Sequence, residues 1–275
     1  MNDTAKSQAV NLQELSRALR LKALEMAFHA GKSGAHLGGG LSVIEIMAAL
    51  YGRVMNVSSA DPTNPERDRL VVSKGHCVLA YYAALHYFGF ISDGELAGFE
   101  VNGSSLHGHA TRNVRMGIEF SGGSLSMGAS FGVGVAMAMR REGRTNHVYV
   151  LVGDGECDEG LVWEASMAAA NFKLDNLTMI VDANALQYDG PTSEIMDKGS
   201  LTEKFRAFGF LAMDVNGHDT DALVQAFGAD SQGRPKAIVA HTVKGKGVSF
   251  MEQKREWHHS VLNASQYQQA IAEQG

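Results

Sequence analysis

The residues with the clearest chemical potential follow two apolar runs of the chain. Asp154 stands between two glycines after the run His147–Val152, and Asn184 follows the run Leu177–Val181. A strand that ends in Gly-Asp-Gly and leads into a helix presents backbone N–H groups beside a carboxylate, which suits a diphosphate carrying a divalent cation. Gly-Asp-Gly alone is equally typical of a plain turn, so the prediction of a cation site depends on the pairing with Asn184.

Commoner phosphate-binding loops do not match this segment. A dinucleotide fingerprint requires glycine where the chain has Asp158, and a P-loop requires Gly-Lys-Ser/Thr, which is absent. If the two apolar runs are neighbouring parallel strands joined by a helix at Leu161–Phe172, oxygens of Asp154 and Asn184 converge on one hard cation. Magnesium uses few protein ligands and keeps positions for phosphate and water. We therefore predict a magnesium site, with the Leu186 carbonyl as a third candidate ligand.

Strand-like and helical patterns alternate along the chain and predict an α/β fold, a parallel sheet flanked by helices. The strand-like runs are Arg69–Ser73, His147–Val152, Leu177–Asp182, Phe210–Val215 and Lys236–Thr242. The helical patterns are Leu12–Ala30, Ser42–Gly52, a stretch through Tyr82 and Leu85 to Phe88, Leu161–Phe172, Leu201–Phe208 and Thr220–Phe227. Ligands of such sheets bind beyond the carboxyl ends of the strands, where Asp154 and Asn184 fall. Asp189–Ser200 has turn residues and predicts a loop, and residues 1–275 are expected to form a single domain.

The segment Ser124–Arg140 predicts a helix with unusually smooth faces. Its small residues are Gly128, Ala129, Gly132, Gly134, Ala136 and Ala138. Such a helix permits close approach of another backbone, either inside the molecule or at a subunit interface. The pattern favours neither of the two.

Composition excludes several classes of function. The chain has 275 residues, 45% of them apolar, and a net charge of −6, with no run of basic residues longer than two. Nucleic acid and anionic membrane surfaces are therefore not expected as partners. Cys77 and Cys157 are too few and too far apart for a disulfide framework or a zinc site. Because Met1–Val10 is polar and no long apolar run follows, we predict a cytoplasmic protein.

Taken together, several motifs resemble one family. The span from Gly153 through Trp163-Glu164-Ala165 to Asn184 and Asp189-Gly190 resembles the thiamine-diphosphate-binding fold, and in detail the N-terminal part of transketolase. Four further segments agree with that family: Ser33-Gly-Ala-His36 with Gly38-Gly39, Asp68-Arg-Leu-Val-Val-Ser-Lys-Gly-His76, His107-Gly-His109, and Lys244-Gly-Lys-Gly247 through Trp257-His258. Their order and spacing cover nearly the whole chain, which makes the combination far more specific than any one motif.

The resemblance implies a site that holds thiamine diphosphate and Mg²⁺. The implied metal ligands are Asp154, Asn184 and the Leu186 carbonyl. The implied cofactor-binding residues are Lys74, His76, Gly123, Ser124, Leu125, Asp154, Gly155, Glu159, Asn184, Lys244 and His258. The implied catalytic residues are His36, His109 and His258. For Glu159 the resemblance implies a role at a subunit contact, whereas its position alone indicates a charge that favours the helix dipole.

Several histidines suit the chemistry that the resemblance implies. Ketol transfer removes a proton from a sugar hydroxyl and returns one to an aldehyde oxygen, and imidazole titrates near neutrality. The cofactor supplies the electron sink. Each candidate also has a plainer interpretation. A loop histidine can simply form a hydrogen bond within its own turn, which applies to His36, His76, His109 and His258, and Lys74 and Lys244 are compatible with ordinary solvated lysines. His107 and His259 are ambiguous neighbours of these candidates.

The chain departs from the family pattern in three places. Ala35-His36-Leu37 stands where the family has His-Pro after Ser-Gly, and His259 stands where glycine usually follows Trp-His. The family also uses a glutamate against the cofactor's aminopyrimidine, and the sugar-phosphate arginines lie with it in a following module. The sequence ends at Gly275 without that module. We therefore expect a separate transketolase C-terminal subunit that carries the pyrimidine-binding module, and an α2β2 heterotetramer.

The expected activity is transfer of a two-carbon ketol unit from a ketose phosphate to an aldose acceptor, with sugar phosphates as substrates. The α subunit of a 2-oxoacid dehydrogenase shares the Gly-Asp-Gly and Asn site and remains an alternative. A non-catalytic cofactor-binding subunit is another. A nucleotide-dependent oxidoreductase is disfavoured because the glycine spacing fails.

Overall fold

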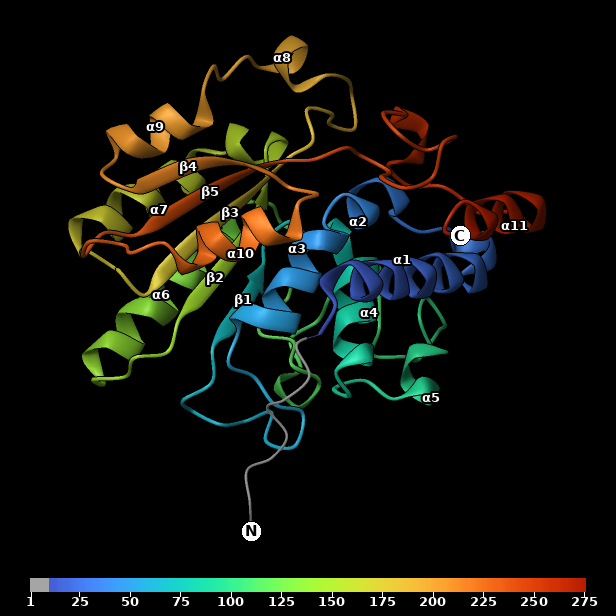
Figure 1. Ribbon diagram of the computed structural model, residues 1–275, viewed down its shortest axis with the longest axis horizontal. Helices are drawn as coiled ribbons and strands as arrows, with labels where there is room; N and C mark the ends of the chain where they lie inside the picture. Colours follow the sequence, from blue (N-terminus) through green and yellow to red (C-terminus); the bar gives the residue numbers. More distant parts are fainter. Residues whose placement is uncertain (1–9) are drawn as a thin grey trace.

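The computed structural model describes residues 10–275 and contains one five-stranded parallel sheet (Figure 1). The strand order is β1-β2-β3-β5-β4, with β1 at Arg69–Val72, β2 at Val148–Gly153, β3 at Leu177–Ala183, β4 at Leu211–Asn216 and β5 at Lys236–His241. Every strand pairing is parallel. The predicted α/β class, with its parallel sheet, is confirmed. The prediction of a cytoplasmic protein depends in part on the polar segment Met1–Val10, and residues 1–9 of that segment lie outside the described part.

Helices cover both faces of the sheet. Their bounds are α1 Leu12–His29, α2 Leu37–Leu41, α3 Ile44–Ala49, α4 Val78–Tyr87, α5 Asp93–Leu96, α6 Met127–Arg141, α7 Gly160–Asn171, α8 Thr192–Ile195, α9 Leu201–Ala207, α10 Thr220–Gly228 and α11 Ala264–Ala272. Helices α6, α7 and α9 pack on one face, and α1, α3, α4 and α10 lie on the other (Figure 1). Between Val10 and Gly275 no helix has the length and apolar character needed to cross a bilayer.

Alternation along the strands divides the core into two apolar clusters. On β2, Val148, Val150 and Val152 face the cluster under α6, α7 and α9, whereas Tyr149 and Leu151 face the cluster under α3, α4 and α10. Successive side chains of a strand point to opposite faces, so a strand covered on both sides is apolar throughout. Each such buried side chain contributes about 1.5–3 kcal/mol to folding.

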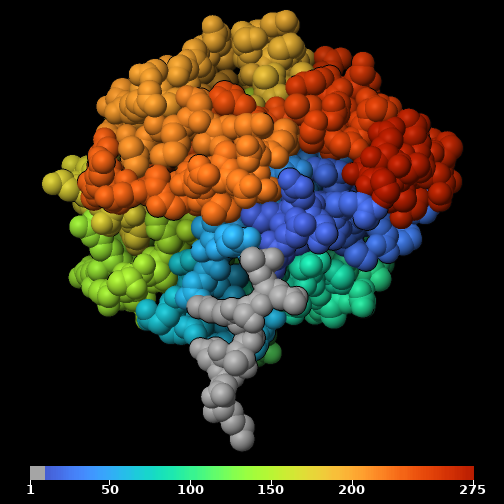
Figure 2. Space-filling model, viewed as in Figure 1, coloured from blue at the N-terminus to red at the C-terminus, as the bar shows by residue number. Residues whose placement is uncertain are grey.

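The C-terminal segment packs back on the N-terminal third of the chain. Helix α11 lies against α1, and the two regions adjoin in the space-filling view (Figure 2). Ala35 and Ser260 exchange two backbone hydrogen bonds of 3.0 Å in an antiparallel bridge. This bridge brings the segment after Trp257 beside His36.

The helix predicted at Ser42–Gly52 is only partly an α-helix. The α-helix begins at Ile44 and gives way to a π-helical turn at Leu50–Val54. A Cβ added to Gly52 would lie 2.7 Å from a methyl of Leu12 and 2.8 Å from one of Leu15, so α1 packs directly on this backbone. The predicted loop at Asp189–Ser200 is also incomplete, since it contains the single turn of α8.

The structure shows which small residues of helix α6 contact the rest of the molecule. A Cβ on Gly128 would approach the Ser73 Cβ to 2.5 Å, and one on Gly132 would approach a Val150 methyl to 2.3 Å. Gly128, Ala129, Gly132 and Ala136 are therefore buried on the side of α6 that packs on the sheet, whereas Gly134 and Ala138 are exposed. The opposite face exposes Met127 and Phe131, which are 50% and 37% accessible.

Candidate active site

A pocket of about 340 Å³ opens at the carboxyl ends of β2 and β3. Twelve of the residues singled out from the sequence line it: His36, Lys74, His76, His109, Gly123, Leu125, Asp154, Gly155, Asn184, Leu186, Lys244 and His258. Two others lie outside the lining. Ser124 is exposed beside Gly123, and Glu159 is exposed at the start of α7, where its side chain caps no backbone group.

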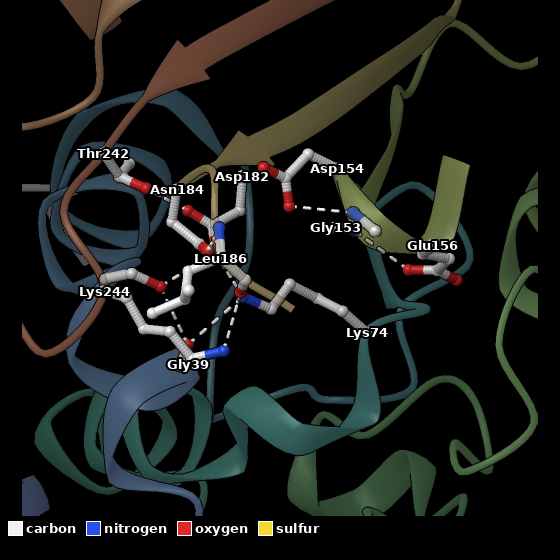
Figure 3. Close-up of polar contacts among 12 residues, drawn as sticks. Gly39, Lys74, Gly153, Asp154, Glu156, Asp182, Asn184, Leu186, Thr242 and Lys244 are labelled. Atoms are coloured by element: carbon white, nitrogen blue, oxygen red, sulfur yellow. Dashed lines mark hydrogen bonds and ion pairs between the residues drawn. The ribbon is translucent and has the colours of Figure 1, made fainter. Parts of the chain in front are cut away.

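Asp154, at the end of β2, lies near Asp182 and Asn184 at the end of β3 (Figure 3). Gly153 of β2 pairs with Asp182 of β3, so the next residues of both strands meet at one edge of the sheet. The Asp154 carboxylate accepts from the Gly155 N–H at 2.8 Å and from the Ala185 N–H at 2.7 Å. Desolvation, followed by the nearby carboxylate of Asp182, raises the pKa of Asp154. A bound cation would offset both effects.

The donor set at this edge fits a hard cation. It comprises the carboxylate of Asp154, the side-chain oxygen of Asn184 and the backbone carbonyl of Leu186, and the two side chains are only 7% and 4% exposed. No three His, Cys, Asp or Glu residues form a metal cluster anywhere in residues 10–275. A single carboxylate with neutral oxygens matches Mg²⁺ that also binds phosphate, and leaves the diphosphate to supply the remaining negative charge.

Neither of the two lysines in the pocket is a solvated surface residue. Lys74 is fully buried, forms an ion pair with Asp182 and donates to the Gly39 carbonyl at 3.2 Å. Lys244 is 2% exposed and donates to the Leu186 carbonyl at 2.7 Å. Burial and the charge of Lys74 lower the pKa of Lys244 to about 8, so its charge depends on pH near neutrality.

Four of the candidate histidines form one cluster. The ring centroid of His36 lies 5.1 Å from that of His109 and 5.6 Å from that of His258, and His76 lies 5.1 Å from His258. His259 joins them, with its ring 4.6 Å from that of His36. The candidates that the sequence placed in separate loops are therefore neighbours.

The environment keeps these imidazoles neutral. Burial, assisted by the neighbouring His259, lowers the pKa of His36 to about 3, and burial with Lys244 lowers that of His258 to about 4. Burial also lowers the pKa of His76 and of His109. Lys244 donates to His258 Nδ1 at 2.9 Å, which leaves the proton on Nε2. A neutral imidazole offers one donor and one acceptor to a substrate.

Two buried acids at the pocket were missed by the sequence analysis. Glu156 accepts from the Ser126 N–H at 2.6 Å and from the Gly153 N–H at 2.9 Å, and so joins β2 to the start of α6. Asp182 is fully buried beneath Asn184. The available signal was position: Glu156 follows Gly-Asp-Gly directly, and Asp182 stands two residues before Asn184, on the same side of an extended segment.

Comparison with known proteins identifies the family of this chain. Residues 11–275 match the family model described as transketolase, thiamine diphosphate binding domain. The chain is 41% identical over 268 residues to one subunit of the apulose-4-phosphate transketolase of Phocaeicola vulgatus, covering 97% of this chain and 94% of that protein. It is 40% identical over 269 residues to 6-deoxy-6-sulfo-D-fructose transketolase subunit SqwG of a Clostridium species, covering 97% of each.

A solved structure gives the same result for the fold. Transketolase from Leishmania mexicana superposes with a TM-score of 0.90 at 30% sequence identity. The match covers 98% of this chain and 42% of the Leishmania chain, so this chain spans less than half of that relative. With relatives at 40% identity over nearly its whole length, the chain belongs to the transketolase family, as its thiamine-diphosphate-binding domain.

Proposed function

We propose that this chain is the diphosphate-binding subunit of a split transketolase. With a separate partner chain it transfers a two-carbon ketol unit from a ketose phosphate to an aldose acceptor. One observation carries the proposal: twelve predicted cofactor, metal and catalytic positions line a single pocket. The similarity to proteins named as transketolase subunits, which have nearly the length of this chain, supports a two-chain enzyme. We further propose that residues 1–275 form a single domain.

Each group in the pocket has a distinct role in this proposal. Asp154, Asn184 and the Leu186 carbonyl hold Mg²⁺ and, through it, the diphosphate. Thiamine diphosphate supplies the electron sink for cleavage of the carbon–carbon bond. The neutral imidazoles of His36 and His109 exchange protons with the sugar hydroxyl and the aldehyde oxygen. Charged Lys244 donates to Nδ1 of His258, so His258 carries its proton on Nε2.

The partner chain completes the site. It provides the acid that the cofactor's aminopyrimidine requires, and the cofactor lies between the two polypeptides. Exposed apolar side chains on α6 and α7 support an assembly, because isolated soluble surfaces rarely expose such patches. They are Met127, Phe131, Met137 and Met167. We propose an α2β2 heterotetramer in the cytoplasm, where the buried free thiols of Cys77 and Cys157 remain reduced.

The first test is reconstitution. The chain alone is expected to lack ketol transfer, and addition of the partner subunit with Mg²⁺ and thiamine diphosphate restores it. The assay follows aldehyde release from a ketose phosphate donor and product formation from an aldose acceptor. Release of CO₂ from pyruvate without any ketose activity would instead identify a 2-oxoacid dehydrogenase subunit. Cofactor binding without either activity would indicate a non-catalytic subunit.

The second test concerns the exposed face of α6. Phe131→Asp is expected to weaken assembly at least about tenfold, because a desolvated carboxylate at an interface costs more than about 1.4 kcal/mol. Analytical ultracentrifugation measures the dissociation constant. Tyr87→Asp is the matched control, since Tyr87 is 52% exposed on α4, across the sheet from α6. Equal assembly of the two variants would remove this face from the proposed interface.

A further inference from the structure

The buried carboxylate of Asp182 contacts groups from four separate segments (Figure 3). Its Oδ2 accepts from Asn184 Nδ2 at 2.7 Å and from Ser42 Oγ at 2.8 Å, and it pairs with the ammonium of Lys74. Its Oδ1 accepts from Thr242 Oγ1. Asp182 has no exposed surface, so no part of it reaches a ligand directly. Every contact of the carboxylate is therefore with the protein.

These contacts decide which end of the Asn184 amide faces the cation site. A carboxylate only accepts hydrogen bonds, so the side of Asn184 that faces Asp182 must be the NH₂ group. The amide oxygen is then directed to the other side, where it accepts from the Leu186 N–H at 3.1 Å. A rotated amide would place its oxygen against the carboxylate and its NH₂ group toward the cation, which is unfavourable on both sides.

We infer that Asp182 is a positioning residue, which holds the Asn184 amide with its oxygen toward the metal ion. This inference rests on the proposed function. Groups behind a metal ligand orient it in this way, and their loss weakens metal affinity about 10–100-fold. Lys74 affects Asn184 only indirectly, through its ion pair with Asp182. Its ammonium compensates the buried charge of Asp182, since an unpaired carboxylate at this depth would be strongly destabilising.

A matched pair of double variants tests the inference. Lys74→Met/Asp182→Asn and Lys74→Met/Asp182→Leu both remove the buried ion pair, so they share its effect on folding. They differ in one respect. Asparagine keeps an oxygen that accepts from Asn184 Nδ2 and Ser42 Oγ and presents its own NH₂ to Thr242 Oγ1, whereas leucine offers no acceptor.

The readout is the dissociation constant of Mg²⁺, by isothermal titration calorimetry in the presence of thiamine diphosphate, on the chain reconstituted with its partner. We expect the leucine variant to bind Mg²⁺ at least about tenfold more weakly than the asparagine variant. Equal constants would overturn the inference. If circular dichroism shows that the leucine variant is unfolded, Lys74→Met/Asp182→Ala, which also lacks an acceptor, carries the same comparison.

The outcome also separates this inference from the proposed function. Wild-type complex that binds neither Mg²⁺ nor thiamine diphosphate would overturn the proposed function, and this inference with it. Wild-type binding together with equal affinities in the matched pair would overturn only the role of Asp182. Adding Asn184→Asp to the leucine variant is expected to restore Mg²⁺ affinity. Both terminal atoms of an aspartate side chain are oxygens, so either face of the carboxylate can bind the cation and no partner is needed to orient it. A failure of that rescue would count against the role as well.

Discussion

Replacement of Asp154 with alanine is expected to abolish cofactor binding and, with it, ketol transfer. Asp154 supplies the only carboxylate among the proposed metal ligands, and it also accepts hydrogen bonds from the Gly155 and Ala185 N–H groups. Alanine removes the ligand and also removes the acceptor of both part-buried N–H groups. We expect the affinity for Mg²⁺ with thiamine diphosphate to fall at least about 100-fold, the upper end of what loss of an outer-shell partner costs.

Calorimetry of the reconstituted complex measures this loss, and Asp158→Asn is the control. Asp158 lies four residues away on the same segment, pairs with Lys198 and does not line the pocket. Its substitution changes local charge by the same amount and should leave cofactor affinity within about twofold of wild type. Asp154→Asn keeps an oxygen donor and should fall between wild type and alanine. Unchanged affinity in Asp154→Ala would remove the proposed metal site altogether.

The sheet could be predicted because each strand carries its own signal. All five strands match predicted strand-like runs. Strands β2 and β3 carry the strongest signal, since a parallel strand covered on both faces is apolar along its length, whereas the edge strand β4 is only partly buried. The meeting of Asp154 and Asn184 follows from the pairing of β2 with β3 and was predicted on that basis. Helices α5 and α11 were missed, although each begins with a capping box, Ser92 with Glu95 and Asn263 with Gln266.

The inner part of the site was harder to predict because its contacts join distant segments. Lys74 and Asp182 are 108 residues apart, and nothing local to either one indicates that they pair. The family resemblance identified Lys74 as a residue beside the cofactor, whereas the structure gives its ammonium an internal partner. A sequence pattern reports which element a residue belongs to, but not which side chain lies opposite it.

His36 is the second position at which a large effect is expected. Its Nδ1 is buried and has no hydrogen-bond partner among the described residues, and its ring centroid lies 5.1 Å from that of His109 and 4.6 Å from that of His259. A polar atom buried without a partner is costly unless another molecule supplies one. The pocket lining includes His36, so we expect a sugar hydroxyl to contact the accessible edge of its ring rather than the buried Nδ1.

His36→Ala is therefore expected to lower kcat by about 10²–10⁴-fold, the usual contribution of a positioned proton-transfer group. Cofactor affinity should not change, because His36 has no hydrogen bond to Asp154, Asn184 or Lys244 within residues 10–275. Steady-state kinetics and calorimetry on the same preparation separate the two quantities. His86→Ala is the control, since His86 pairs with Asp93 on the surface of α4 and α5. A kcat within about twofold of wild type would exclude His36 from the reaction.

The low pKa of His36 also predicts how the stability of the protein depends on pH. Burial and the neighbouring His259 lower the pKa to about 3, whereas an unfolded histidine titrates near 6.5. The unfolded chain therefore binds the proton more readily, and the contribution of His36 to stability, present above pH 6.5, is lost as the pH falls toward 3. His36→Ala lacks this contribution, so its melting temperature should fall less than that of wild type between pH 7 and pH 5. Because the imidazole is neutral throughout that interval, the ratio of wild-type to variant kcat should stay constant between pH 7 and pH 5. A ratio that changes with pH would mean that solvent protonates His36 within this interval.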